Sequence, residues 1–200
     1  VDNVLLADFN ANPKKYLKDS KGDWKYDTVF FGSWDNNGGR GAIGDITVLA
    51  RNILEEFIQS GRGLVLGHDT LHGTGDHHPN FAPLRHYANI KLQDFDNIPS
   101  VPHIGSTKIK ITRRGLLLEY PWKIGDVGTV LTIPYTHSTR QIALGDVWME
   151  FHEPHGYHYQ GPPVSDPETG RGTSNFYLTS WNNVAMIQTG HSNGKATPDE

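Results

Sequence analysis

The chain has 200 residues, of which 36% are hydrophobic, and its formal net charge is -4 at pH 7. A single domain with a sizeable core is expected at this length. Cysteine is absent, which excludes disulfides, thiolate metal sites and a cysteine nucleophile. The acidic balance offers no basic footprint for a nucleic-acid partner, and no apolar run is long enough to predict a membrane span.

Four short apolar runs predict strands of a parallel sheet. They are Val4–Ala7, Thr28–Gly32, Gly63–Gly67 and Val184–Thr189. Continuous apolar runs of this length are typical of strands that are covered on both faces. We therefore expect an α/β fold with a mostly parallel sheet flanked by helices.

A helix from Asp45 to Gln59 is predicted between the second and third of these runs. Its apolar residues repeat at helical spacing, at Ile46, Leu49, Ile53 and Phe57. A strand, a helix and a second strand in this order imply a right-handed crossover and a parallel pair.

The region after the third run has a different pattern. Lys108–Thr112 and Thr129–Thr132 alternate polar and apolar residues, which is typical of exposed antiparallel strands, and Asp146–Phe151 is a further candidate. Near the end, Asn182 and Asn183 tolerate the positive φ angles of a tight hairpin turn. We therefore expect two strands to pair across these asparagines.

Polar residues follow the predicted parallel strands. In an open α/β sheet the ligand site lies beyond the carboxyl ends of the strands. We expect one rim of the sheet to gather a ligand-binding set that consists of Asp8, Asp35, His68, Asp69, Thr70 and His191.

His68, Asp69 and His72 form the sharpest candidate for a divalent metal site, because imidazole and carboxylate groups are suitable ligands for zinc and similar ions. His191 or Asp35 would complete such a set. The alternative is that His68 and Asp69 bind loop backbone at a tight turn, with Thr70 assisting. His152, His155 and His158 share a Pro- and Gly-rich loop with Tyr157 and Tyr159, which favours a surface loop and leaves a sugar-stacking surface as the alternative.

The segment Thr136–Gln141 follows an apolar strand and holds groups that can bind a polar ligand, including Gln141. His137 is a candidate general base, because its unperturbed pKa lies near neutrality. A Ser-His-Asp triad is not indicated, since no Gly-x-Ser-x-Gly elbow is present. Gly39–Gly44 matches a dinucleotide fingerprint, but a lone match in a loop is a weak signal and an anion at a helix start is the alternative.

The two ends of the chain predict that it is a segment of a longer polypeptide. Thr197-Pro198-Asp199-Glu200 has the pattern of a helix start, with a Thr cap and Pro at the first helical position. The predicted strand Val4–Ala7 begins only a few residues after Val1. The rest of that polypeptide is therefore an expected partner.

The run Gly63-Leu64-Val65-Leu66-Gly67-His68-Asp69 resembles the nucleophile elbow of class I glutamine amidotransferases, which reads roughly Gly-x-Cys-x-Gly-His-Gln. Gln188-Thr189-Gly190-His191 resembles the final strand of that family, which ends in the catalytic His. Gly61-Arg62-Gly63 is more similar to the trehalose-utilisation-like branch. The resemblance implies a flavodoxin-like sheet, a Val65 in place of the cysteine and therefore lost thiolate chemistry. Residues 100–175 fit this core poorly and are interpreted as an insertion.

Two functional hypotheses follow. The first is a catalytically degenerate amidotransferase-like domain that serves as a binding or structural module of a larger, surface-exposed protein, with a carbohydrate or a protein as partner. The second is a carbohydrate-active enzyme that uses His68, Asp69, His137 and His191, with a divalent metal as its candidate cofactor. We expect an extracellular or cell-surface location rather than a cytoplasmic one.

Overall fold

A computed structural model describes residues 1–32 and 44–190 of the chain. The helices are α1 (Leu6–Ala11), α2 (Pro13–Leu17), α3 (Val48–Gln59), α4 (Arg85–Ala88) and α5 (Leu116–Glu119), with a 3-10 turn at Ala82–Leu84. The strands are β1 (Thr28–Phe31), β2 (Gly63–Leu66), β3 (Ile90–Leu92), β4 (Gly105–Ile111), β5 (Val130–His137), β6 (Gln141–Ala143), β7 (Asp146–Phe151), β8 (Leu178–Trp181) and β9 (Val184–Ile187).

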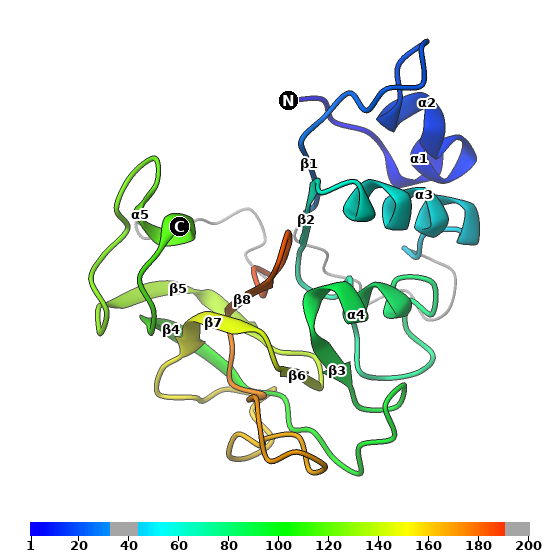
Figure 1. The fold of residues 1–200 in the computed structure, drawn as a ribbon. Helices are drawn as coiled ribbons and strands as arrows, with labels where there is room; N and C mark the ends of the chain where they lie inside the picture. The colour runs from blue at the N-terminus through cyan, green and yellow to red at the C-terminus, as the bar shows by residue number, and fades with distance from the viewer. Residues whose placement is uncertain (33–43, 191–200) are drawn as a thin grey trace.

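The fold is α/β, built on a mixed sheet of seven strands in the order β1-β2-β9-β8-β7-β4-β5 (Figure 1). Strands β3 and β6 form a separate antiparallel pair. Three of the four predicted parallel strands are confirmed as β1, β2 and β9, and β2 pairs in parallel with both of the others. The predicted β-α-β unit is therefore present, with α3 between β1 and β2.

The expectation of a mostly parallel sheet is wrong. The pairs β9–β8, β8–β7, β7–β4 and β4–β5 are all antiparallel. Asn182 adopts a φ of 49° between β8 and β9, so the predicted hairpin turn is confirmed and the chain direction reverses there. Strands β4, β5 and β7 from residues 100–175 continue the same sheet from that point.

The first predicted strand is also wrong. Residues Leu6 to Ala11 form α1, which buries Phe9 while Leu5 stays exposed. An apolar run of four residues does not distinguish a strand from a helix start, and here the buried position beyond the run decided the outcome. Asp8 consequently lies exposed in the first turn of α1 and not at the rim of the sheet.

Helix α3 confirms the predicted helix but begins later than Asp45. Thr47 is its N-cap, and the Thr47 hydroxyl accepts a hydrogen bond from the Ala50 N–H at 3.2 Å. The Asp45 carboxylate is buried and accepts instead from the backbone N–H groups of Ile46, Asn80 and Phe81. Asp45 thereby fixes the loop after residue 78 to the start of α3.

The largest core lies against one face of the parallel strands. Leu64, Leu66, Val184 and Met186 pack there with the buried side of α3. A second core joins β4, β5 and β7 through Ile109, Ile133 and Phe151, among others. Within residues 1–32 and 44–190, no helix has the length and apolar character needed to cross a bilayer.

Candidate functional site

Histidines from four distant segments meet beyond the end of β2. His68 follows β2, His137 ends β5, His103 stands just before β4, and His158 lies in the loop after β7. The ring centroid of His137 lies 4.9 Å from that of His68, 5.1 Å from that of His103 and 4.0 Å from that of His158. The antiparallel pairing of β4 with β5 places His103 beside His137, since Gly105 is the partner of His137 in the ladder.

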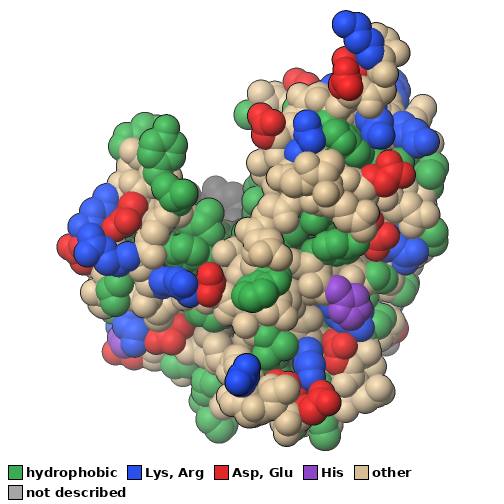
Figure 2. Space-filling model, in the orientation of Figure 1, with side chains coloured by type: hydrophobic (Ala, Val, Ile, Leu, Met, Phe, Trp, Pro, Cys, Tyr) green, Lys and Arg blue, Asp and Glu red, His purple; other side chains and the backbone are tan. Residues whose placement is uncertain are grey.

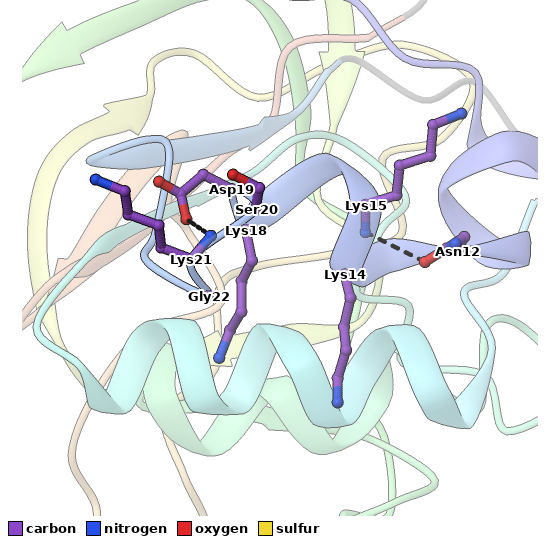
Figure 3. Close-up of a pocket in the computed structure, with 8 residues that line it drawn as sticks. All are labelled: Asn12, Lys14, Lys15, Lys18, Asp19, Ser20, Lys21 and Gly22. Atoms are coloured by element: carbon purple, nitrogen blue, oxygen red, sulfur yellow. Dashed lines mark hydrogen bonds between the residues drawn. The ribbon is translucent and has the colours of Figure 1, made fainter.

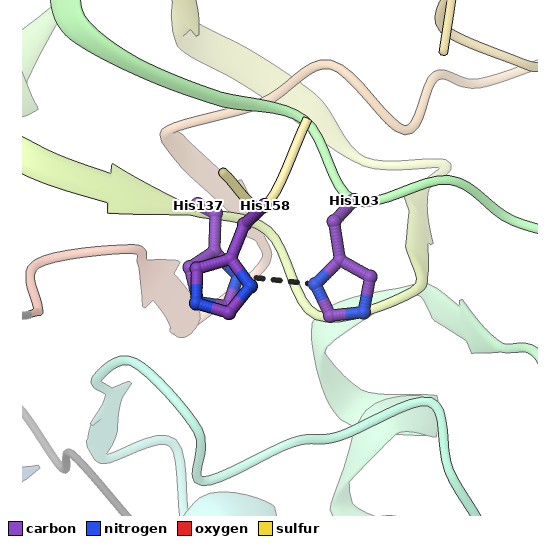
Figure 4. Close-up of side chains that lie close together, drawn as sticks. All are labelled: His103, His137 and His158. Carbon is purple, nitrogen blue, oxygen red and sulfur yellow. Dashed lines mark hydrogen bonds between the residues drawn. The ribbon is translucent and has the colours of Figure 1, made fainter. Parts of the chain in front are cut away.

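His103, His137 and His158 form a group that could hold a metal ion. Each offers one ring nitrogen, and these three nitrogens lie within 4.8 Å of one another (Figure 4). The two Nδ1 atoms of His103 and His137 are 3.1 Å apart. Two ligands on a tetrahedral zinc ion, at the usual Zn–N length, are about 3.3 Å apart. Among the described residues this is the one group of three potential ligands that converges in this way.

Burial keeps the imidazoles of His103 and His137 in the uncharged form. Desolvation, assisted by the neighbouring Arg140 charge, lowers the pKa of His103 from 6.5 to about 4. The pKa of His137 is lowered further, again mainly by burial and next by His68. At neutral pH both rings are therefore uncharged.

The hydrogen-bonding pattern around His103 and His137 conflicts with two neutral rings. Arg140 Nε donates to His103 Nε2 at 3.2 Å, which leaves the single proton of His103 on Nδ1. His137 Nδ1 also lies 2.8 Å from the Ser138 carbonyl oxygen, a contact that requires a proton on that nitrogen. Two N–H groups would then face each other across 3.1 Å. A cation between the two Nδ1 atoms would replace these protons, and His137 would then no longer donate to the Ser138 carbonyl, nor would His103 Nε2 accept from Arg140.

Tyr135 and Gly156 position the loop that carries His158. The Tyr135 hydroxyl accepts a hydrogen bond from the His158 N–H at 3.1 Å. Gly156 has a φ of 91°, and a Cβ atom there would lie 2.3 Å from the Tyr135 ring. Tyr157 is 76% exposed and stacks on Tyr135 with ring centroids 5.1 Å apart. The loop therefore adds an open aromatic surface next to the histidines.

A chain of buried amides reaches the His68 ring. Gln141 Nε2 donates to the Leu71 carbonyl oxygen, and Gln188 Nε2 donates to Gln141 Oε1 at 2.5 Å. Gln188 Oε1 is thus an acceptor, and it lies 3.3 Å from His68 Nδ1. His68 Nδ1 can therefore donate to Gln188 Oε1, and His68 Nε2 lies 3.4 Å from Asp69 Oδ1.

Asp69 occupies a constrained turn after β2. Its φ is 63°, a conformation that L residues adopt at a cost. His78 Nδ1 donates to the Asp69 carbonyl oxygen at 2.6 Å, and Thr70 Oγ1 donates to the Gly67 carbonyl oxygen at 2.7 Å. Val65, by contrast, lies inside β2, between Phe30 of β1 and Ala185 of β9.

The structure brings together five of the predicted site residues: His68, Asp69, Thr70, His137 and Gln141, all of them buried. The predicted metal set of His68, Asp69 and His72 is not the one that converges. His72 uses Nδ1 to accept from the Thr74 N–H at 3.1 Å and stacks on His77, and burial lowers its pKa to about 2. Asp35, His191, Gly39 and the proposed helix start at Thr197 lie outside the described residues.

Sequence reasoning missed His103 and gave His158 little weight. Neither residue follows a parallel strand, so the expectation that site residues lie beyond the carboxyl ends of parallel strands does not point to them. His103 could have been found only from the pairing register of β4 and β5.

No family model matches the chain, and no curated protein or solved structure matches it either.

A hollow of about 520 Å³ lies at α2 and shares no residue with the histidine cluster (Figure 3). It is lined by Asn12, Lys14, Lys15, Lys18, Asp19, Ser20, Lys21 and Gly22. Lys18 lies over the Trp24 ring and pairs with Glu56 at 3.6 Å. These contacts explain the lysines as a solvated surface around a short helix.

Proposed function

We propose that the domain binds one divalent transition metal of the zinc class through His103, His137 and His158 and uses it for hydrolysis. The observation that carries this proposal is the convergence of three imidazole nitrogens within 4.8 Å. Three protein ligands leave one coordination position open, as catalytic zinc sites require. A zinc ion in such a site lowers the pKa of bound water and polarises a substrate oxygen.

The remaining residues have complementary roles. His68 is proposed as the general base, because Asp69 Oδ1 lies 3.4 Å from its Nε2 and would stabilise the charged ring. Tyr157 and Tyr135 would stack a sugar ring, which keeps the expectation of a carbohydrate substrate.

The ligand set favours one reaction class. Glycosidic bonds are usually cleaved by two carboxylates, whereas the described cluster has several imidazoles and one carboxylate, Asp69. We therefore propose hydrolysis of an ester or amide group carried by a carbohydrate.

Turnover tests this function. Zinc-loaded protein should hydrolyse acetylated sugars, and removal of zinc with a chelator should abolish the activity. His68→Asn should lower kcat by about 100-fold while zinc binding persists, whereas the exposed His86→Asn should match the wild type. An absence of turnover with any acetylated sugar in the zinc-loaded wild type would overturn the reaction class.

We propose a finer description of the fold as well. The unit of β1, α3, β2 and β9, with its two parallel pairs, supports a flavodoxin-like core of the kind expected from amidotransferase-like domains. The aliphatic Val65 within β2 is consistent with a site that has moved to the histidines.

The module hypothesis remains the second candidate, because one lobe exposes many apolar side chains (Figure 2). They are Leu116, Leu117, Tyr120, Trp122, Ile124, Val127 and Val130. Patches of this kind commonly mark protein contacts. The lobe borders β5, the edge strand of the large sheet, so the simplest partner is a second copy of this chain. Sedimentation velocity should show that the wild-type chain self-associates and that the double variant Leu116→Ser/Trp122→Ser is monomeric. A monomeric wild type would contradict this candidate.

A further inference from the structure

Arg140 stands beside the proposed metal ligands in a fixed backbone position. Its φ is 58°, in the left-handed region, and its carbonyl oxygen accepts from the Gln93 N–H at 3.2 Å. Gly73 packs directly on it, because a Cβ on Gly73 would lie 2.2 Å from the Arg140 carbonyl oxygen. The adjacent Thr139 carbonyl accepts from the Gly73 N–H at 2.7 Å. The backbone of Arg140 is thus held by the segments around Gly73 and Gln93, and its side chain reaches His103.

The Arg140 charge has no carboxylate partner within ion-pair distance among residues 1–32 and 44–190. Asp94, whose pKa is lowered chiefly by the Gly75 N–H and also by Arg140, uses its carboxylate for Gly75 and Gln93. Within the described residues, the Arg140 side chain donates a hydrogen bond from Nε to His103 Nε2. Its two terminal nitrogens are therefore available to a ligand. A cation in this position normally serves to bind an anion.

Metal coordination would break the contact between Arg140 and His103. A metal on His103 Nδ1 leaves the single ring proton on Nε2, and that nitrogen can no longer accept from Arg140 Nε. The guanidinium group then loses its partner next to a divalent cation. Two positive groups side by side favour an anion that bridges or faces both.

We propose, on the basis of the proposed metal site, that Arg140 forms an oxyanion-binding subsite that becomes available when the metal binds His103. The substrate would carry a carboxylate, sulfate or phosphate group, which the planar guanidinium binds through two parallel hydrogen bonds. Metal and anion would therefore bind with positive cooperativity, and by linkage each raises the affinity for the other by the same factor.

The test measures zinc affinity by competition with a chromogenic chelator, with and without millimolar acetate, sulfate or phosphate. Wild-type protein should bind zinc at least about fivefold more tightly with one of these anions present. Arg140→Gln should lose this enhancement and bind zinc without anion at least as tightly as the wild type, because a repelling charge is gone. Arg113→Gln, at an exposed arginine paired with Asp146, is the matched control and should behave as the wild type.

The outcomes separate the two proposals. If acetate alone raises the zinc affinity, the substrate carries a carboxylate. If sulfate or phosphate alone raises it, the substrate is a sulfate or phosphate ester. Either result supports the subsite, provided that the Arg140→Gln protein no longer shows the increase in zinc affinity. Zinc binding that no anion strengthens, or an enhancement that survives in Arg140→Gln, overturns the subsite and leaves the metal site intact. A protein that binds no zinc overturns the proposed function instead.

Discussion

Nδ1 of His103 and Nδ1 of His137 lie 3.1 Å apart, although the residues are separated by 34 positions in the chain. Both rings are buried and uncharged at neutral pH, and each has a second polar neighbour, Arg140 for His103 and Ser138 for His137. This pair is the centre of the proposed site, because two buried ring nitrogens at this separation could both reach one cation.

The metal-free protein should lose stability as the pH falls. The pKa of His103 is about 4 in the folded state and near 6.5 when unfolded, so the unfolded state binds an extra proton between these values. The stabilisation is therefore complete above about pH 6.5 and lost as the pH falls toward 4, at about 1.4 kcal/mol per pH unit for each such histidine. The free energy of unfolding, measured with urea at several pH values, should depend less steeply on pH in His103→Gln, by this amount per pH unit. The exposed His86→Gln is the control, and equal slopes in all three proteins would refute the assignment.

Gly156→Ala should weaken metal binding. The new Cβ would collide with the Tyr135 ring and displace the loop that carries His158, so zinc affinity should fall by about tenfold or more. Gly161→Ala in the same loop is a matched control, since Gly161 also has a positive φ, 143°, but a Cβ there meets nothing within 4 Å. Isothermal titration with zinc compares the two variants. Equal affinities would show that the Tyr135 contact does not position His158.

Gln188→Leu should destabilise the fold. The substitution removes the donor to Gln141 Oε1 and the acceptor near His68 Nδ1, and both groups are buried. Loss of partners in the core costs about 1–3 kcal/mol per group. Gln59→Leu, at an exposed glutamine bonded to the Tyr87 hydroxyl, should cost less than about 0.5 kcal/mol. Denaturant unfolding measures both, and a neutral Gln188→Leu would mean that the amide chain does not hold His68.

The parallel part of the fold could be predicted because its signals are local. Helix α3 has an unbroken apolar stripe, and β1, β2 and β9 are continuous apolar runs. The turn at Asn182 needs a positive φ, and Asn is one of the few residues that tolerate it. Each of these features depends on neighbours within a few residues.

The antiparallel half and the metal ligands depend on long-range pairing. The alternation in Lys108–Thr112 predicts a strand but does not say that β4 joins the same sheet as β2. His103 becomes a candidate only once β4 and β5 pair with Gly105 opposite His137. His68 and Asp69 were found because they follow a parallel strand, whereas His158 arrives on a loop whose position depends on Tyr135.

Zinc titration of chelator-treated protein at neutral pH tests the metal site most directly. The account predicts one equivalent bound by the wild type and by His86→Ala, and a loss of at least about tenfold in affinity for His158→Ala, whose half-buried loop position should spare the fold. The absence of stoichiometric binding to the wild type, or undiminished affinity in a folded His158→Ala protein, would contradict it.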